Sequence, residues 1–174
     1  MNDEAPDWRA AASELTEDEK RANAIRLAFG GEVDRFNEFV ETLGAELPEQ
    51  TAAVLGGSSV SGFRWEDGSP FDADGPFTSD LDLTLVGNEI LSVYGLTGFY
   101  VPGVHTRPLN DDTLDIAPDL VPLRRRLMKI VKNRPVNIQA TRDFYVWIRE
   151  HWLGQPYLLL VGKVEEDEAR CCSA

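Results

Sequence analysis

Residues 80–86 read Asp-Leu-Asp-Leu-Thr-Leu-Val, and polar and apolar side chains alternate along most of this stretch. A period of two is typical of a β-strand that buries one face. The three leucines then point into the core, while Asp80 and Asp82 emerge together on the opposite face, about 7 Å apart by strand rise. One strand therefore predicts both part of a hydrophobic core and a pair of neighbouring carboxylates.

A glycine–serine turn precedes this strand in the sequence. Residues 51–55 are apolar for most of their length and are followed by Gly56-Gly57-Ser58, which predicts a buried strand that ends in a turn. Glycine lets the backbone approach a phosphate closely, and a helix beginning near Ser58 would direct amide groups at that phosphate. The turn therefore predicts a phosphate-binding site. The alternative is an ordinary strand-to-helix turn in which Ser58 caps the helix.

The paired aspartates suit divalent cations. Two carboxylates about 7 Å apart can jointly hold one or two Mg²⁺ ions, and Mg²⁺ favours carboxylates, water and substrate phosphates. Two ions at such a site stabilise both the attacking and the leaving oxygen of an in-line displacement. Beside the turn at Gly57 and Ser58, the pair Asp80 and Asp82 therefore indicates metal-dependent nucleotidyl transfer. The alternative is the solvated face of an edge strand.

The rest of the chain predicts one domain of helices and strands. A capping-box pattern from Thr16 to Glu19 marks the start of a helix. We expect a single domain over residues 16–165, preceded by an acidic arm at 1–15 and followed by a tail at 166–174. The expected helices span 16–29, 32–43 (with Gly44 as the C-cap), 88–94, 118–132 and 142–152, the expected strands span 51–55, 80–86, 99–101, 135–140 and 157–164, and the expected loops span 63–79 and 104–117.

Composition excludes several functional classes. The net charge of -13 over 174 residues argues against general binding to nucleic-acid backbones. The chain lacks an apolar run long enough for a membrane span, and its acidic N-terminus is unlike a secretory signal, so we expect a cytoplasmic protein with no membrane partner. Six basic residues between Arg124 and Arg134 form a local exception. They indicate either a solvated helix face or an electropositive flank for a triphosphate or nucleic acid.

Several aromatic residues and both histidines lie outside the glycine–serine turn and the aspartate strand. Four aromatics occupy helical spacings within 142–152, where core packing explains them better than base stacking; they are Phe144, Tyr145, Trp147 and Trp152. His151 follows them, and we expect it to be structural. His105 and Arg107 lie in an expected loop, where loop anchoring and substrate contact both stay open.

Gly57-Ser58-x-x-x-Gly62, followed by Ser79-Asp80-Leu81-Asp82-Leu83, resembles the motif of the DNA polymerase β-like nucleotidyltransferase superfamily. The resemblance covers residues 50–140 of the chain. It implies an α/β (α+β) fold, with a small mixed sheet flanked by helices. It also implies a nucleoside triphosphate substrate, with Gly57 and Ser58 holding the triphosphate and with Asp80 and Asp82 binding Mg²⁺ or Mn²⁺.

Two features depart from the superfamily pattern. Ser58 and Asp80 are 22 positions apart, which is longer than in compact members, and residues 68–72 and 134–137 look similar to bacterial nucleotidyltransferase-like proteins, some of them toxin domains. Many members also carry a third carboxylate on a neighbouring strand, which helps deprotonate the attacking hydroxyl. The matching strand here offers Asn137 and Gln139 instead. The open substitutes are Asp72, Asp74, Asp115 and Asp119.

The expected reaction transfers a nucleoside monophosphate from the triphosphate to an acceptor hydroxyl, and pyrophosphate leaves. The acceptor is a protein side chain, an RNA end or a small molecule. One alternative is a toxin–antitoxin component that modifies a protein or tRNA and has a protein partner of that type. The other is a catalytically silent nucleotide-binding module, because neither Asn137 nor Gln139 is a base.

Overall fold

Six strands form one mixed sheet in the computed structural model of the protein, which describes residues 7–164. The strand order is β3-β4-β5-β2-β1-β6. At the centre, β2 is antiparallel to β1 and parallel to β5. The strands are β1 (Ala52–Gly56), β2 (Leu81–Val86), β3 (Phe99–Val101), β4 (His105–Thr106), β5 (Val136–Thr141) and β6 (Leu158–Val161). The chain therefore has the mixed sheet and the α+β class that the sequence predicts.

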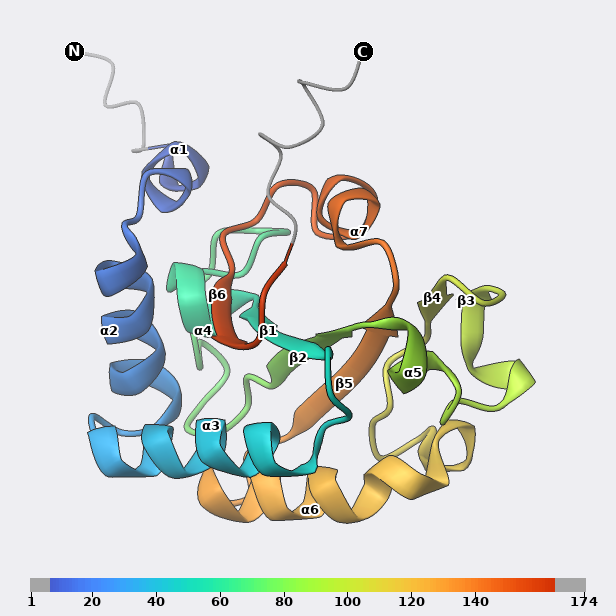
Figure 1. The fold of residues 1–174 in the computed structure, drawn as a ribbon. Coiled ribbons are helices and arrows are strands. Elements are labelled where there is room, and N and C mark those ends of the chain that lie inside the picture. The colour runs from blue at the N-terminus through green and yellow to red at the C-terminus, as the bar shows by residue number, and fades with distance from the viewer. Residues whose placement is uncertain (1–6, 165–174) are drawn as a thin grey trace, which may run out of the picture.

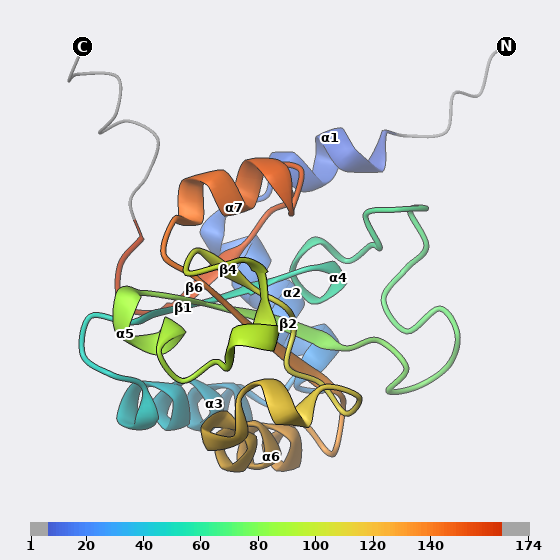
Figure 2. The ribbon, with the colours of Figure 1, turned by 90° about the vertical axis from the view of Figure 1, so that its right-hand side faces the viewer.

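Helices lie against both faces of this sheet (Figure 1). α3 and α6 lie side by side beneath it, and α7 lies above it. α2 runs along one side and packs on the single-turn helix α4, as Figure 2 also shows. The helices are α1 (Trp8–Ser13), α2 (Glu17–Ala28), α3 (Val33–Glu46), α4 (Ser58–Ser61), α5 (Asn88–Leu91), α6 (Val121–Ile130) and α7 (Phe144–Glu150).

The main core lies between the sheet and the pair α3 and α6. Leu81, Leu83 and Leu85 are fully buried, so the leucine face of β2 is the core face, as predicted. Burial of each such side chain contributes about 1.5–3 kcal/mol relative to exposure. The same cluster includes Phe36, Phe39 and Leu43 of α3 and Leu123 and Leu127 of α6.

Four strands were predicted to within one residue at each end, including β3, which matches the expected strand 99–101. β1, β2 and β5 match the expected strands 51–55, 80–86 and 135–140. The expected strand at 157–164 is shorter, and the expected loop at 104–117 contains β4. Two residues are too few to show a period, so β4 has no sequence pattern of its own.

Several helix boundaries need correction. The expected helix at 88–94 ends at Leu91, and the expected helix at 142–152 spans Phe144–Glu150. Gly44 does not cap its helix, because α3 continues to Glu46. The helix ends at Leu47, which is extended with ψ 146°, the conformation that a residue before proline prefers. The expected helix at 118–132 begins as a separate 3₁₀ turn, Pro118–Leu120, before α6.

The expected N-terminal arm contains α1. Trp8 packs edge-on against Trp65, with 5.3 Å between ring centroids, and Arg9 donates a hydrogen bond of 2.7 Å to the backbone oxygen of Trp65. Residues 1–6 and 165–174 lie outside the described residues, and so do the expected C-terminal tail and most of the acidic N-terminal stretch. Between residues 7 and 164, no helix is long and apolar enough to cross a membrane.

Gly56, at the end of β1, leaves no room for a side chain. A Cβ atom there would lie 2.3 Å from Cη2 of the buried Trp152 ring. We therefore expect Gly56→Ala to lower the free energy of unfolding by about 1–3 kcal/mol through overpacking. Thermal unfolding measures this loss as a drop in Tm of about 2–4 °C per kcal/mol.

Gly44→Ala is the matched control for this substitution. Gly44 lies inside α3 with nothing within 4 Å of a Cβ atom, so alanine there should stabilise the protein by about 0.5–1 kcal/mol. A Tm for Gly56→Ala that equals or exceeds that of the parent would contradict the packing of Trp152 on β1.

Candidate functional site

One cavity brings together the four residues of the sequence motif. Its volume is about 530 Å³, within the usual range of small-molecule sites. Gly57, Ser58, Asp80 and Asp82 all line it. The other walls come from the loop at 63–79, from β3 and from the region of α7. The cavity therefore lies on the face of the sheet opposite the leucines.

The turn between β1 and α4 lies directly against Asp82. β1 pairs with β2 so that Gly56 is opposite Asp82. Gly57 has a φ of 73°, and a Cβ atom at this position would lie 2.8 Å from Oδ2 of Asp82. Glycine is therefore required both for the backbone conformation and for the space beside the carboxylate.

The helix expected at Ser58 is present but short. α4 has four residues, and Gly57 rather than Ser58 occupies its N-cap position, so the interpretation of Ser58 as a cap is wrong. Because the helix dipole is a sum over aligned peptides, one turn contributes little to it. Any attraction of the turn for a phosphate therefore depends on backbone amides and on the Ser58 side chain.

Asn137 lies between the two carboxylates. β2 and β5 pair so that Asp82 is opposite Asn137. The Asn137 amide donates hydrogen bonds to Oδ2 of Asp80 and, at 3.1 Å, to Oδ1 of Asp82. Asp80 is exposed and Asp82 is half-buried. The neighbouring strand therefore holds the two carboxylates side by side through the Asn137 amide.

The carboxylate pair carries more negative charge than its surroundings compensate. Burial, and then the charge of Asp80, raise the pKa of Asp82 to about 7, while the hydrogen bond from Asn137 acts in the opposite direction. A divalent cation would relieve this repulsion. No group of three His, Cys, Asp or Glu side chains within residues 7–164 is arranged to hold a metal. Two carboxylates in an open cavity fit Mg²⁺, which keeps water and substrate phosphates as its other ligands.

The proposed substitutes for a third carboxylate lie away from the cavity lining. Asp72 pairs with Arg134, and Asp74 pairs with Arg64 at 2.7 Å. Asp115 lies on the 3₁₀ turn Leu114–Ile116, and Asp119 lies on the turn before α6. Glu66 lines the cavity instead, and its charge contributes to the raised pKa of Asp82. Glu66 lies in the loop at 63–79, where no sequence pattern singles it out.

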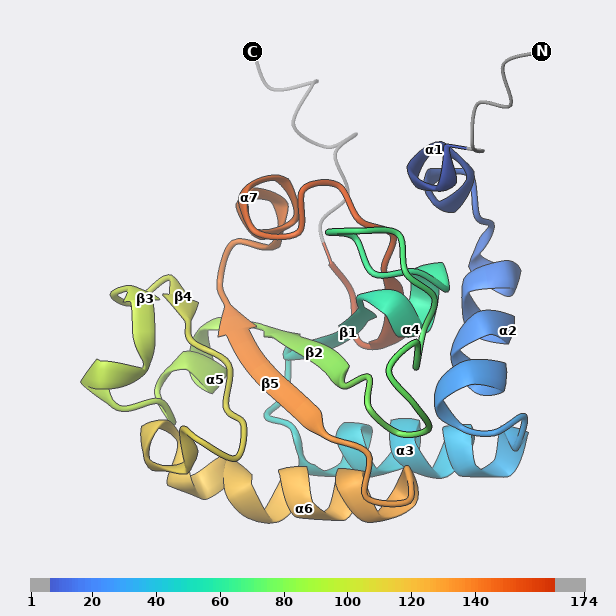
Figure 3. The ribbon, with the colours of Figure 1, turned by 180° about the vertical axis from the view of Figure 1, so that it is seen from behind.

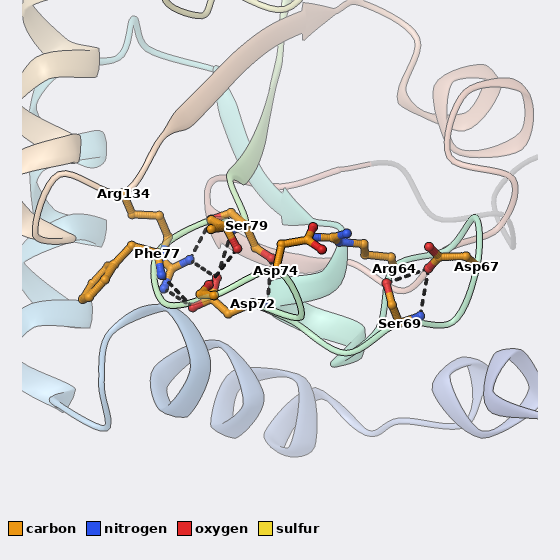
Figure 4. A network of polar contacts seen from close by, with 10 residues as sticks. Arg64, Asp67, Ser69, Asp72, Asp74, Phe77, Ser79 and Arg134 are labelled. Carbon is orange, nitrogen blue, oxygen red and sulfur yellow. Dashed lines mark hydrogen bonds and ion pairs between the residues drawn. The ribbon is translucent and has the colours of Figure 1, made fainter.

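Contacts among Asp72, Ser79 and Arg134 close that loop, and we call them the loop clasp (Figure 4). Arg134 donates to both oxygens of Asp72, at 2.7 and 2.8 Å, and to the backbone oxygen of Ser79 at 2.6 Å. The Ser79 amide donates to Oδ1 of Asp72 at 2.9 Å. The buried guanidinium lies 4.5 Å from the ring centroid of Phe71. Because Ser79 directly precedes Asp80, the loop clasp sets where β2 begins.

The six basic residues between Arg124 and Arg134 were interpreted either as a solvated helix face or as an electropositive flank of the site, and neither interpretation fits all of them. Arg124 is buried, and it donates to the backbone oxygen of Val136 at 2.6 Å and to Asp111 at 2.7 Å. Arg134 is buried in the loop clasp, so these two residues are not part of a solvated face. α6 packs on the leucine face of the sheet, and the cavity lining includes none of the six residues. Arg64, from the loop at 63–79, lines the cavity as a cation.

The aromatic residues near α7 have two roles. Phe144, Trp147 and Trp152 form a second buried cluster with Val54 of β1, which agrees with the expected core packing. Trp147, Trp152 and the expected structural residue His151 also line the cavity, and sequence reasoning missed this. Tyr100 of β3 lines it too.

The two remaining candidates, His105 and Arg107, lie outside the cavity lining. His105 is buried, with Nδ1 at 2.6 Å from Oγ1 of Thr141. Burial, and then the nearby His151, lower the pKa of His105, which favours the neutral ring at pH 7. Arg107 donates to the backbone oxygen of Thr97 at 3.3 Å, which corresponds to loop anchoring.

Asp82 should make the stability of the metal-free protein depend on pH. The folded protein binds the Asp82 proton more tightly than the unfolded chain, where the pKa is near 3.8. The free energy of unfolding should therefore decrease by a few kcal/mol as the pH rises from about 4 to about 7. Asp82→Asn should remove this decrease and raise the Tm at pH 8. Thermal unfolding in a chelator from pH 4 to 8 measures both effects.

Asp119→Asn is the control for this pH series, because Asp119 is exposed and lies outside the cavity lining. Its unfolding curves should follow those of the parent. If Asp82→Asn and the parent lose stability in parallel between pH 4 and pH 7, the raised pKa of Asp82 is wrong.

Arg134→Leu should break the loop clasp and leave Asp72 without its partner. Removing one member of a buried ion pair costs about 3–5 kcal/mol. Burial acts to raise the pKa of Asp72, but the bonds from Arg134 and from the amides of Ser79 and Phe77 lower it to about 2. The contribution of the pair is therefore complete above about pH 4 and is lost as the pH falls toward 2.

Denaturant unfolding at pH 7 measures this loss, with Arg125→Leu as the control at an exposed position of α6. The two variants should differ by most of the expected free energy. Equal stability of Arg134→Leu and Arg125→Leu would mean that the loop at 63–79 does not depend on the clasp.

Comparisons of the chain with models of protein families, with curated proteins and with solved structures find no match. The geometry of the cavity is therefore the basis for assigning a function. A carboxylate pair, a glycine–serine turn and an arginine share its lining.

Proposed function

We propose that the protein is a metal-dependent nucleotidyltransferase, which moves a nucleoside monophosphate from a nucleoside triphosphate to an acceptor hydroxyl. The observation that carries the proposal is the convergence of Asp80, Asp82, Gly57 and Ser58 on one cavity. The turn offers amide and hydroxyl donors to phosphate oxygens. The aspartates offer the anionic oxygens that a phosphate-bound Mg²⁺ ion prefers.

The residues of the polar part of the cavity then have distinct roles. Asp80 and Asp82 would hold Mg²⁺ or Mn²⁺, which when bound neutralises phosphate charge and orients the reacting oxygens. Gly57 lets the triphosphate approach the backbone, and Ser58 donates a hydrogen bond to it. Arg64 supplies positive charge for the pyrophosphate that leaves.

The proposed step is an in-line displacement at the α-phosphorus. The acceptor oxygen forms a bond to the α-phosphorus. At the same time the bond from the α-phosphorus to the oxygen that bridges it to the β-phosphate breaks, and pyrophosphate leaves with that oxygen. The acceptor proton passes to water or to Glu66, because the Asn137 amide is not a base and Asp80 and Asp82 would be occupied by the metal. The acceptor is a protein side chain, an RNA end or a small molecule.

A catalytically silent nucleotide-binding module is the second candidate. Asn137 favours it, because an amide cannot accept the proton that a third carboxylate would take, and general-base assistance is worth about 10²–10⁴-fold in rate. Calorimetry with ATP, with and without Mg²⁺, combined with a turnover assay, separates the two functions. Mg²⁺-dependent binding without any transfer would support the silent module.

Asp80→Asn and Asp82→Asn should each abolish Mg²⁺-dependent transfer. Removing one ligand charge weakens the stabilisation of the reacting phosphate, and we expect a loss of about 100-fold or more in rate, equivalent to about 3 kcal/mol. The assay incubates the protein with each α-³²P-labelled nucleoside triphosphate, Mg²⁺ or Mn²⁺, and a cell lysate. The class of molecule that becomes labelled identifies the acceptor.

Asp115→Asn is the matched control, since Asp115 is an exposed carboxylate outside the cavity lining. It should transfer label at the parent rate. Undiminished labelling by a folded Asp80→Asn or Asp82→Asn variant would exclude the carboxylate pair from the reaction.

A further inference from the structure

The cavity has two chemically different walls. Asp80, Asp82 and the turn at Gly57 form a polar wall. Tyr100, Trp147, His151 and Trp152 form the other, and we call them the aromatic wall. In Figure 3, α7 lies above the sheet, between the pair β3 and β4 on one side and α4 on the other. A ligand in this cavity therefore meets both anionic or hydrogen-bonding groups and flat rings.

The aromatic wall is held from beneath by buried groups. His105 packs against Trp147 and His151, with 5.3 and 5.1 Å between ring centroids. Trp147 is only 2% exposed, and His151 stacks on it at 4.3 Å with an angle of 24° between the rings. These contacts hold the His151 ring nearly parallel to a rigid indole.

Two rings of the aromatic wall keep open surfaces. Tyr100 is 59% exposed, and His151 is exposed. Their rings are nearly parallel, at 17°, and their centroids are 6.4 Å apart. Stacked bases lie about 3.4 Å from each other, so one planar base between two parallel rings needs about 6.8 Å. The 6.4 Å between centroids is the most that the spacing of the two ring planes can be, so a base enters between them only after the Tyr100 side chain moves, and exposed side chains change rotamer on a ps–ns timescale.

Core packing does not account for the whole aromatic wall. It explains Trp147 and Trp152, but Tyr100 and His151 leave much of their surface in water. The indole N–H of the buried Trp147 also has no acceptor among the described residues. Buried polar groups are usually paired, so core packing alone does not explain this indole N–H.

Two carboxamides also line the cavity. Gln139 and Gln155 line it together with the aromatic wall. Gln139 donates to Oγ1 of Thr84 at 3.3 Å, so its oxygen stays available as an acceptor. A carboxamide offers both donors and acceptors, which suits the edge of a nucleobase.

We propose that the aromatic wall is the nucleobase subsite, in which the base of the nucleoside triphosphate stacks on Tyr100 and His151 while its triphosphate lies at Gly57 and the carboxylates. This inference rests on the proposed function and specifies how its substrate is bound. Stacking accepts every base, because each has a flat π-face. Any preference among bases then comes from Gln139 and Gln155.

Binding measurements on the full chain test the proposal. Calorimetry with Mg²⁺ compares each of the four nucleoside triphosphates with inorganic tripolyphosphate, which has no base. Tyr100→Ala and His151→Ala should each weaken nucleoside triphosphate binding by about 5- to 100-fold and leave tripolyphosphate binding unchanged. Tyr145→Ala, on α7 but outside the cavity lining, should match the parent. Melting curves check that each variant is folded.

The outcomes separate this inference from the proposed function. If the parent binds both probes and neither Tyr100→Ala nor His151→Ala changes nucleoside triphosphate affinity, the base subsite is wrong and the proposed function stands. If the loss falls instead on a short oligoribonucleotide, the aromatic wall takes a base of an RNA acceptor and the proposal is overturned. If the parent binds neither nucleoside triphosphate nor tripolyphosphate, both proposals fail.

Discussion

The register of β2 is the constraint on which the rest of the structure depends. β2 is paired on both sides, and its side chains alternate between the apolar core and the cavity. A shift of one residue would turn the leucines toward the cavity and force Asp82 into the core, where an unpartnered charge costs several kcal/mol. The hydrophobic energy of Leu81, Leu83 and Leu85 therefore also holds the carboxylates in place. The same register puts Gly56 on one side of Asp82 and Asn137 on the other.

The loop clasp fixes the start of β2 relative to β5 at the end of the sheet where the site lies. β2 and β5 are parallel, so the residues that precede them, Asp80 and Arg134, lie at the same edge. Arg134 binds Asp72 and the backbone of Ser79, and it thereby joins the start of β5 to the loop that leads into β2. The entropy of closing a loop grows only slowly with its length. A long insertion is therefore compatible with a well-positioned carboxylate pair if its end is held by such an ion pair.

The residues that sequence reasoning located are those with a local pattern. Alternation identified the core face of β2, and the glycines before Ser58 identified the turn beside it. The aromatic wall has no comparable pattern, because Tyr100 and His151 come from segments far apart in the chain. They meet only because β4 pairs with the end of β5, where His105 faces Thr141. Arg124 was misread for a related reason: its partners, Val136 and Asp111, are distant in sequence, and only they make its burial possible.

Asn137 changes the electrostatics of the site as well as its acid–base chemistry. A carboxylate at this position would place a third negative charge beside Asp80 and Asp82 and would raise the cost of folding without metal. The amide instead donates to both aspartates, and its bond to Asp82 acts against the larger effects of burial and of the Asp80 charge, which raise the pKa of Asp82. The amide therefore reduces, without removing, the cost of folding around two carboxylates. An amide is not a base, so in the proposed reaction the removal of the acceptor proton is left to water, to Glu66 or to the acceptor itself.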